Sequence, residues 1–141
     1  MELKPTRIFE LAEYTRQKFN KTDVLAGKED GIWRTYSADE YVNITDSVAY
    51  GLLNLGIDRG DKVAIISPNR PEWSLADMGI NKIGAINVPI YPNITTPDYE
   101  YILNDSGARI LLVGSEEIFD KVKMLIDKVE TLEAIYSFDE I

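Results

Sequence analysis

Four apolar runs, separated by segments with helical periodicity, restrict the fold of this chain more than any other feature. The runs are KVAII at residues 62–66, INVPI at 86–90, RILLV at 109–113 and AIYSF at 134–138. KVAII is apolar without alternation, which is typical of a strand buried on both faces. Strands that alternate with helices are joined by right-handed crossovers. The pattern therefore predicts an α/β fold with a mostly parallel sheet flanked by helices.

The segment before the first run predicts two helices with a short strand between them. Thr6 is suited to cap the first helix, and Ser37 with Glu40 has the spacing of a capping box for the second, which ends at Gly56. The turn GKEDG precedes the stretch IWRTY, which is typical of an edge strand. The predicted buried stripes are Ile8, Leu11, Thr15 and Phe19 on the first helix, and Tyr41, Ile44, Val48, Leu52 and Leu55 on the second.

Three further helices are expected between the apolar runs. One follows SPNRPEW and stops at Gly84, the next is capped by Thr96 and carries Pro97 in its first turn, and the last begins with SEE at residues 115–117. We find no repeat, low-complexity tract or linker, so residues 1–141 are predicted to form a single α/β segment. The expected buried stripes are Trp73, Ala76, Ile80 and Ile83, and then Ile118, Val122, Leu125 and Val129.

Composition argues against several classes of function. The net charge is −9 and no basic cluster is present, so neither nucleic acid nor an anionic membrane is an expected partner. Cysteine and histidine are both absent, which removes thiolate zinc sites, His-based metal sites and His-dependent catalytic sets. We therefore expect no metal site in this segment. No signal-peptide core and no membrane-spanning apolar run is found, so we expect a cytoplasmic protein.

Two loops are candidates for ligand binding, since each follows the carboxyl end of a predicted strand. In SPNRPEW, Asn69 and Glu72 have capping-box spacing and Pro71 suits a first helical turn, so we favour a structural role over anion binding. In IYPNITTP, the ring of Tyr91, the amide of Asn93 and the Thr hydroxyls are able to meet a ligand. There too we favour helix capping. No catalytic residue is predicted in this segment.

Four phrases in order nevertheless indicate a family. WRTYSADEY, VAYGLLNLGIDRGDKVAIISPNRPEW, GAINVPIYPN and YILNDSGARILLV resemble the N-terminal part of the adenylate-forming (AMP-forming) acyl-CoA synthetases, and most closely the long-chain fatty acid–CoA ligases. The resemblance implies that a fatty acid and ATP form an acyl-adenylate and pyrophosphate, after which CoA displaces AMP. It also implies Mg²⁺, and a place for Tyr91, Pro92 and Asn93 near CoA. The family's usual Thr after YP is Asn93 here, which weakens that assignment.

The resemblance implies that the phosphate loop, the metal-binding acid and the catalytic Lys lie beyond residue 141. This segment would then be an inactive scaffold within a larger ligase of lipid metabolism, whose partners are the rest of the same polypeptide and the ligase substrates. A homo-oligomer and a peripheral membrane location of the whole enzyme stay open. Two alternatives also stay open: a self-contained flavodoxin-like module that binds a nucleotide or another ligand, and a small interaction domain.

Overall fold

The computed structural model describes residues 4–140, which form two compact units. One unit comprises the chain up to Gly56 together with Arg70–Ile83, and the other comprises Ile57–Asn69 together with the chain from Gly84. The first contains α1 (Glu10–Phe19), β1 (Leu25–Glu29), β2 (Ile32–Tyr36), α2 (Ala38–Asn54) and α3 (Pro71–Lys82). The second contains β3 (Lys62–Ile66), β4 (Ile86–Ile90), α4 (Thr96–Ser106), β5 (Ile110–Val113), α5 (Glu116–Val122), the 3₁₀ helix η1 (Lys123–Asp127) and β6 (Ala134–Ser137).

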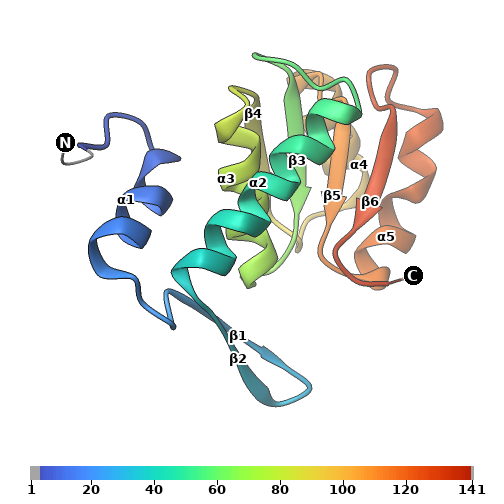
Figure 1. The fold of residues 1–141 in the computed structure, drawn as a ribbon. Coiled ribbons are helices and arrows are strands. Elements are labelled where there is room, and N and C mark those ends of the chain that lie inside the picture. The colour runs from blue at the N-terminus through green and yellow to red at the C-terminus, as the bar shows by residue number, and fades with distance from the viewer. Residues whose placement is uncertain (1–3, 141) are drawn as a thin grey trace. The chain divides into compact units, whose positions relative to one another are not determined.

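The second unit is built on a four-stranded sheet in the order β4-β3-β5-β6, with all neighbours parallel (Figure 1). The predicted α/β class is therefore confirmed. Lys62 pairs with Ile86, and Val63 pairs with Ile110. Pro89 lies in β4, an edge strand, as its missing N–H requires.

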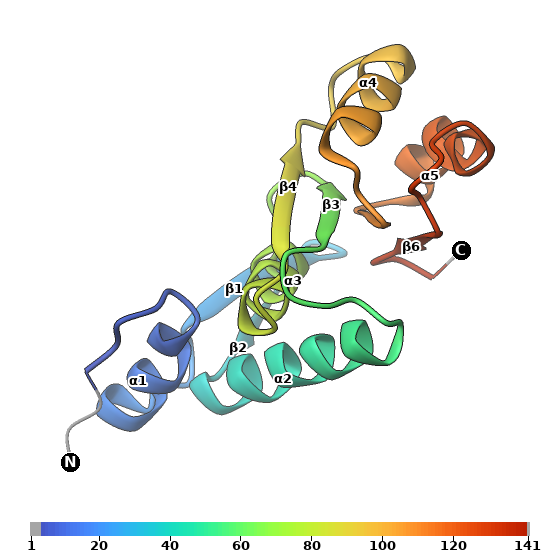
Figure 2. The same ribbon diagram turned by 90° about the horizontal axis from the view of Figure 1, so that it is seen from above.

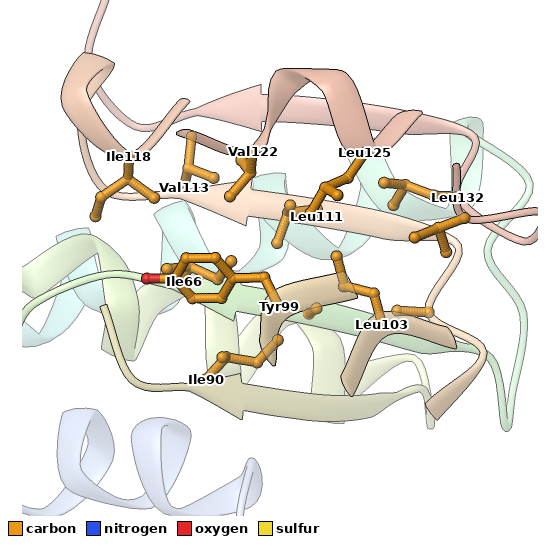
Figure 3. Packing of buried hydrophobic residues seen from close by; sticks show 13 residues of the cluster. Ile66, Ile90, Tyr99, Leu103, Leu111, Val113, Ile118, Val122, Leu125 and Leu132 are labelled. Atoms are coloured by element: carbon orange, nitrogen blue, oxygen red, sulfur yellow. The ribbon is translucent and has the colours of Figure 1, made fainter. Parts of the chain in front are cut away.

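The helices α4 and α5 lie on the same side of this sheet (Figure 2). Every second residue of the central strands, Ala64 and Ile66 in β3 and Leu111 and Val113 in β5, faces the core between the sheet and these helices. Figure 3 shows the ring of Tyr99 lying among these aliphatic side chains. The predicted stripe of the last helix is buried there too: Ile118, Val122, Leu125 and Val129.

The helix predicted from residue 115 is shorter than expected, because α5 gives way to η1 at Lys123. A 3₁₀ turn holds three residues, so residues three apart lie one above the other. Val122 and Leu125 therefore share the buried side across the junction, and both are fully buried. The tighter turn preserves the apolar stripe while ending the α-helical hydrogen-bond pattern.

The first unit departs more from the prediction. The stretch GKEDG is not a simple turn, because residues 25–29 form β1, which pairs antiparallel with β2. The hairpin turns at Asp30–Gly31, where both residues have positive φ, and this dipeptide is a known hairpin signal. Gly27 in β1 approaches α3 closely: a Cβ there would lie 2.6 Å from the ring atoms of Pro71. Only glycine allows this approach.

The stripe predicted for the first helix was wrong. Ile8, Leu11 and Phe19 are exposed, and no residue of α1 is fully buried. Thr6 does not cap the helix, which begins at Glu10 after Phe9. Instead the Glu10 carboxylate turns back and accepts hydrogen bonds from the Thr6 N–H at 2.8 Å and the Arg7 N–H at 3.1 Å. These backbone donors are therefore satisfied from within the helix.

In α2 the capping box is confirmed, since Ser37 Oγ accepts the Glu40 N–H at 3.2 Å and Glu40 Oε2 accepts the Ser37 N–H at 2.8 Å. The buried face of α2 lies about one residue away from the predicted one. Of the five residues predicted, Leu52 is buried, Leu55 is exposed and the rest are half-buried. The face includes small residues, which allow α3 to approach closely. Its members are Ala38, Val42, Thr45, Ala49 and Leu52.

Candidate functional site

The carboxyl ends of the parallel strands in the second unit meet at one edge of the sheet, where ligands of open α/β sheets bind. The loops that leave this edge are residues 67–69 after β3, 91–95 after β4 and 114–115 after β5. Both loops proposed from the sequence thus begin at the same edge. The structure brings the starts of these loops together as a candidate ligand-binding edge.

The loop after β4 presents the most accessible aromatic ring of this edge. Tyr91 is 82% exposed, Asn93 is exposed, and Pro92 between them is half-buried. None of the three side chains has a hydrogen bond or ion pair with another residue of the described range 4–140. The ring and the amide are therefore free to contact a ligand. A role for Tyr91, Pro92 and Asn93 near CoA stays a prediction.

Helix capping occupies the first threonine of this loop. Thr95, and not Thr96 as predicted, is the N-cap of α4, and it forms a capping box with Asp98. The Thr95 hydroxyl donates to Asp98 Oδ2 at 2.6 Å, and the Thr95 N–H donates to the same oxygen at 3.1 Å. These two bonds from Thr95 hold the pKa of Asp98 below its ordinary value. Thr95 and Asp98 thus stabilise the helix start and the end of the loop.

A close contact between Ser67 and Gly114 joins the loops after β3 and β5. The Gly114 N–H donates to the carbonyl of Ile66 at 2.9 Å, which extends the strand pairing by one residue. A Cβ on Gly114 would lie only 2.7 Å from the Cβ of Ser67 and 3.0 Å from Cδ of Pro68. Ser67 itself is buried, and its hydroxyl donates to the Pro68 carbonyl at 2.8 Å. This packing was not predicted from the sequence, although a glycine directly after a strand is a signal for close backbone approach.

The remainder of SPNRPEW starts α3, but not through the predicted capping box. Arg70, and not Asn69, is the N-cap residue, and no side chain caps the helix there. Pro71 occupies the first turn as expected. Glu72 accepts a hydrogen bond from Arg70 Nε at 2.7 Å. Burial is the largest influence on the pKa of Glu72 and would raise it. The hydrogen bonds from Arg70 and from the Glu72 backbone N–H, together with the charges of Arg70 and Arg34, outweigh burial and leave this pKa below its ordinary value.

The described residues do not fit the metal and phosphate groups that the resemblance implies for the whole enzyme. Within residues 4–140, no three His, Cys, Asp or Glu side chains lie together as metal ligands would. The loops after β3 and β4 contain no glycine to cradle phosphates. A lysine could also bind phosphate, but Lys121 on α5 already forms an ion pair with Glu117, with 2.6 Å between Nζ and Oε1. We therefore derive no step through Mg²⁺ or ATP from these residues.

No helix within the described part of the chain combines the length and the apolar character needed to cross a membrane. The longest, α2, has 17 residues and carries Asp39, Glu40 and Asp46. A spanning helix needs about 20 mainly apolar residues.

Both the family model and the relatives of this chain come from one class of enzyme. The family model described as "AMP-binding enzyme" matches residues 12–140. The long-chain-fatty-acid–CoA ligase FadD15 of Mycobacterium bovis is 33% identical over 106 residues, which are 75% of this chain and 18% of that protein. The long-chain-fatty-acid–CoA ligase ACSBG2 of Rattus norvegicus is 27% identical over 135 residues, 95% of this chain and 20% of its own length. This chain thus spans about a fifth of the length of these relatives.

Solved structures share the fold. The anthranilate CoA ligase AuaEII, solved with anthranoyl-AMP, superposes with a TM-score of 0.80 at 26% identity, over 94% of this chain and 25% of that chain. The N-terminal domain of FACL13 from Mycobacterium tuberculosis superposes with a TM-score of 0.84 at 23% identity, over 96% of this chain and 34% of that chain. At that identity the second comparison shows the fold alone. Both agree with the sheet and helices described above.

Proposed function

Because this chain belongs to the AMP-binding enzyme family, we propose that it is the N-terminal part of a long-chain fatty acid–CoA ligase. The whole enzyme joins a fatty acid to CoA in two steps. The fatty acid carboxylate attacks the α-phosphate of ATP and expels pyrophosphate, which leaves an acyl-adenylate. The thiol of CoA then attacks the acyl carbon, loses its proton and expels AMP.

The observation that carries this proposal is the family match over residues 12–140, together with the names of the relatives. The curated relatives described above are long-chain fatty acid–CoA ligases, aligned over most of this chain. The comparisons give no support to a self-contained flavodoxin-like module. Since the chain spans only about a fifth of each relative, the activity, the substrates and the cytoplasmic location belong to the proposal for the whole protein.

Within that enzyme we assign these residues a scaffold role. The sheet of the second unit presents the loops after β3, β4 and β5 at one edge. The Tyr91–Asn93 loop is the surface we propose for CoA, because it combines an exposed ring able to stack with an amide able to donate and accept hydrogen bonds. The groups that bind ATP and Mg²⁺ would come from the rest of the same polypeptide.

A chimaera tests the proposal. Residues of this chain that align with FadD15 of Mycobacterium bovis replace the matching 106-residue segment of that ligase. We expect the chimaera to convert palmitate, ATP and CoA to palmitoyl-CoA, because the scaffold is interchangeable between members of one enzyme class. Leu111→Asp in the chimaera is the control. It buries an unpaired carboxylate in the sheet, so activity and folding should be lost together. A chimaera that is folded but inactive would contradict the proposal.

The isolated chain provides a second test. We expect no ATP–pyrophosphate exchange from the 141-residue chain with palmitate and Mg²⁺, because the described residues lack a metal site and a catalytic set. Intact FadD15, assayed in parallel, verifies that exchange is detectable. Exchange by the isolated chain would overturn the scaffold role, although the ligase assignment would stand.

A further inference from the structure

The first unit contains a cavity of about 240 Å³ that the proposed ligase function does not use. Its walls come from α1, β1, α2 and α3. Most of the lining is aliphatic, including Leu11, Leu25, Ala38 and Met78. No charged side chain lines it.

Three hydroxyl groups interrupt the apolar lining, each from a different helix. They belong to Thr15 on α1, Tyr41 on α2 and Ser74 on α3. None of them hydrogen-bonds to another protein group within the described residues. Burial, and to a lesser extent the nearby carboxylate of Asp77, raise the pKa of Tyr41. The Tyr41 hydroxyl is therefore protonated at neutral pH and able to donate.

One wall of this cavity is α1, a helix with no fully buried residue. Leu11 lines the cavity and is still 47% exposed, so the cavity communicates with solvent beside this helix. Apolar cavities of about 150 Å³ in proteins take up small apolar molecules such as benzene. A larger cavity with an opening and free hydroxyls admits a larger guest.

We propose that this cavity binds a small uncharged molecule with an apolar body and one hydrogen-bonding end, of the kind represented by a medium-chain alcohol. The aliphatic walls accept the body, and the hydroxyls of Tyr41 and Ser74 satisfy the polar end. An ionised carboxylate is excluded, because it would lose its water and find no cation in the lining. The lining residues all belong to the first unit, none of them is part of the candidate edge, and the proposal does not depend on the proposed function.

The experiment is a titration of the 141-residue chain with 1-hexanol, followed by NMR of ¹³C-labelled Met and Ala methyl groups. We expect saturable shifts at Met78, Ala12 and Ala38, which line the cavity, and none at the exposed Met124 of η1. Hexanoate at pH 7 should leave the Met78 signal in place. Absent or unsaturable shifts at Met78, equal shifts at Met124, or equal binding of hexanoate would each overturn the proposal.

Paired variants test the polar contact. Tyr41→Phe removes one hydroxyl at nearly constant volume and should weaken hexanol binding about tenfold, as one lost hydrogen bond predicts. Tyr50→Phe, on the exposed side of the same helix, should bind like the unchanged chain. Ser74→Ala provides a second variant if Tyr41→Phe alters the methyl spectrum of the free chain. Equal affinity of Tyr41→Phe, Ser74→Ala and Tyr50→Phe would show that the hydroxyls take no part and would refute the proposed chemistry.

Discussion

The guanidinium of Arg109 binds the carboxylate of Glu133 through two hydrogen bonds, Nε to Oε1 at 2.6 Å and Nη2 to Oε2 at 3.1 Å. The same two residues are also joined through the backbone, since the Glu133 N–H donates to the Arg109 carbonyl at 2.7 Å. Arg109 Nη1 also binds Asp61, the residue before β3. Glu133 and then Asp61 raise the pKa of Arg109. One side chain thus ties together the amino ends of β3, β5 and β6, opposite the candidate edge.

Replacing Arg109 should lower stability in a graded way. Arg109→Lys keeps the charge but loses the two-pronged geometry, and Arg109→Ala loses both, so the urea midpoint should fall for Lys and further for Ala. Lys123→Ala is the control, because its pair with Asp120 is exposed and such pairs contribute little. Equal midpoints for Arg109→Ala and Lys123→Ala would show that the contacts of Arg109 do not stabilise the sheet.

Gly79 of α3 is required by the close approach of α2. A Cβ at this position would lie 2.5 Å from Cγ1 and 2.8 Å from Cβ of Val48. Gly79→Ala should therefore destabilise the chain by about 1–2 kcal/mol, since overpacking costs more than the gain in helix propensity. Urea unfolding gives this free energy directly.

Gly51 supplies the matched control for that substitution. It lies in α2, and a Cβ there would meet nothing within 4 Å, so Gly51→Ala should stabilise by up to about 1 kcal/mol. Adding Val48→Ala to Gly79→Ala should recover part of the loss, because the two sites are in contact. If the two glycine variants respond alike, helix propensity rather than packing governs Gly79.

Asp98 should make stability depend on pH. Its folded pKa is lowered by the hydrogen bonds from Thr95, so its contribution is complete well above the unfolded value of about 3.8 and is lost as the pH falls through the folded pKa. Asp98→Asn should lower the urea midpoint at pH 7, and the difference should shrink at pH 3 and below. Asp105→Asn, near the other end of the same helix, should show no such loss at pH 7. If the difference in urea midpoint between Asp98→Asn and the unchanged chain stayed constant with pH, the ionised carboxylate of Asp98 would not be the group that stabilises the helix cap.

Tyr91 tests the CoA surface in the whole ligase. Tyr91→Ala should raise the KM for CoA by about three- to tenfold, as loss of one aromatic stacking contact predicts, while ATP–pyrophosphate exchange is unchanged. Tyr101→Ala removes another exposed ring, from α4, and should leave both quantities unchanged. A matching effect of the two variants, or reduced exchange in Tyr91→Ala, would remove Tyr91 from the proposed CoA surface.

The sequence allowed the second unit to be predicted better than the first. KVAII is a strand at the predicted residues, because a strand buried in a parallel sheet needs an apolar run. INVPI is also a strand at the predicted residues, although β4 lies at the edge of the sheet and only Ile90 in it is fully buried. β1 was missed, since Gly27, Lys28 and Glu29 are poor strand formers and its pairing depends on β2. The exposed stripe of α1 shows that helical periodicity alone does not establish burial.

The candidate edge was predicted only in outline. A loop that follows a strand begins at the carboxyl end of that strand, so the loops that start at Ser67 and Tyr91 were each identified as candidates for ligand binding. The contact between Ser67 and Gly114 was not predictable, because it joins residues 47 positions apart in the sequence through the pairing of β3 with β5. The cavity beside Tyr41 was equally invisible, since four separate elements form its walls.

The sequence by itself determined the α/β class, the parallel strands and the capping box at Ser37, because these depend on local periodicity and on groups three residues apart. Tertiary structure alone decided which face of α2 is buried, why Gly79 has to be glycine, and how Arg109 links three strands. Those outcomes depend on which surfaces meet in space, and no local pattern in a single amino-acid sequence predicts contacts between distant segments.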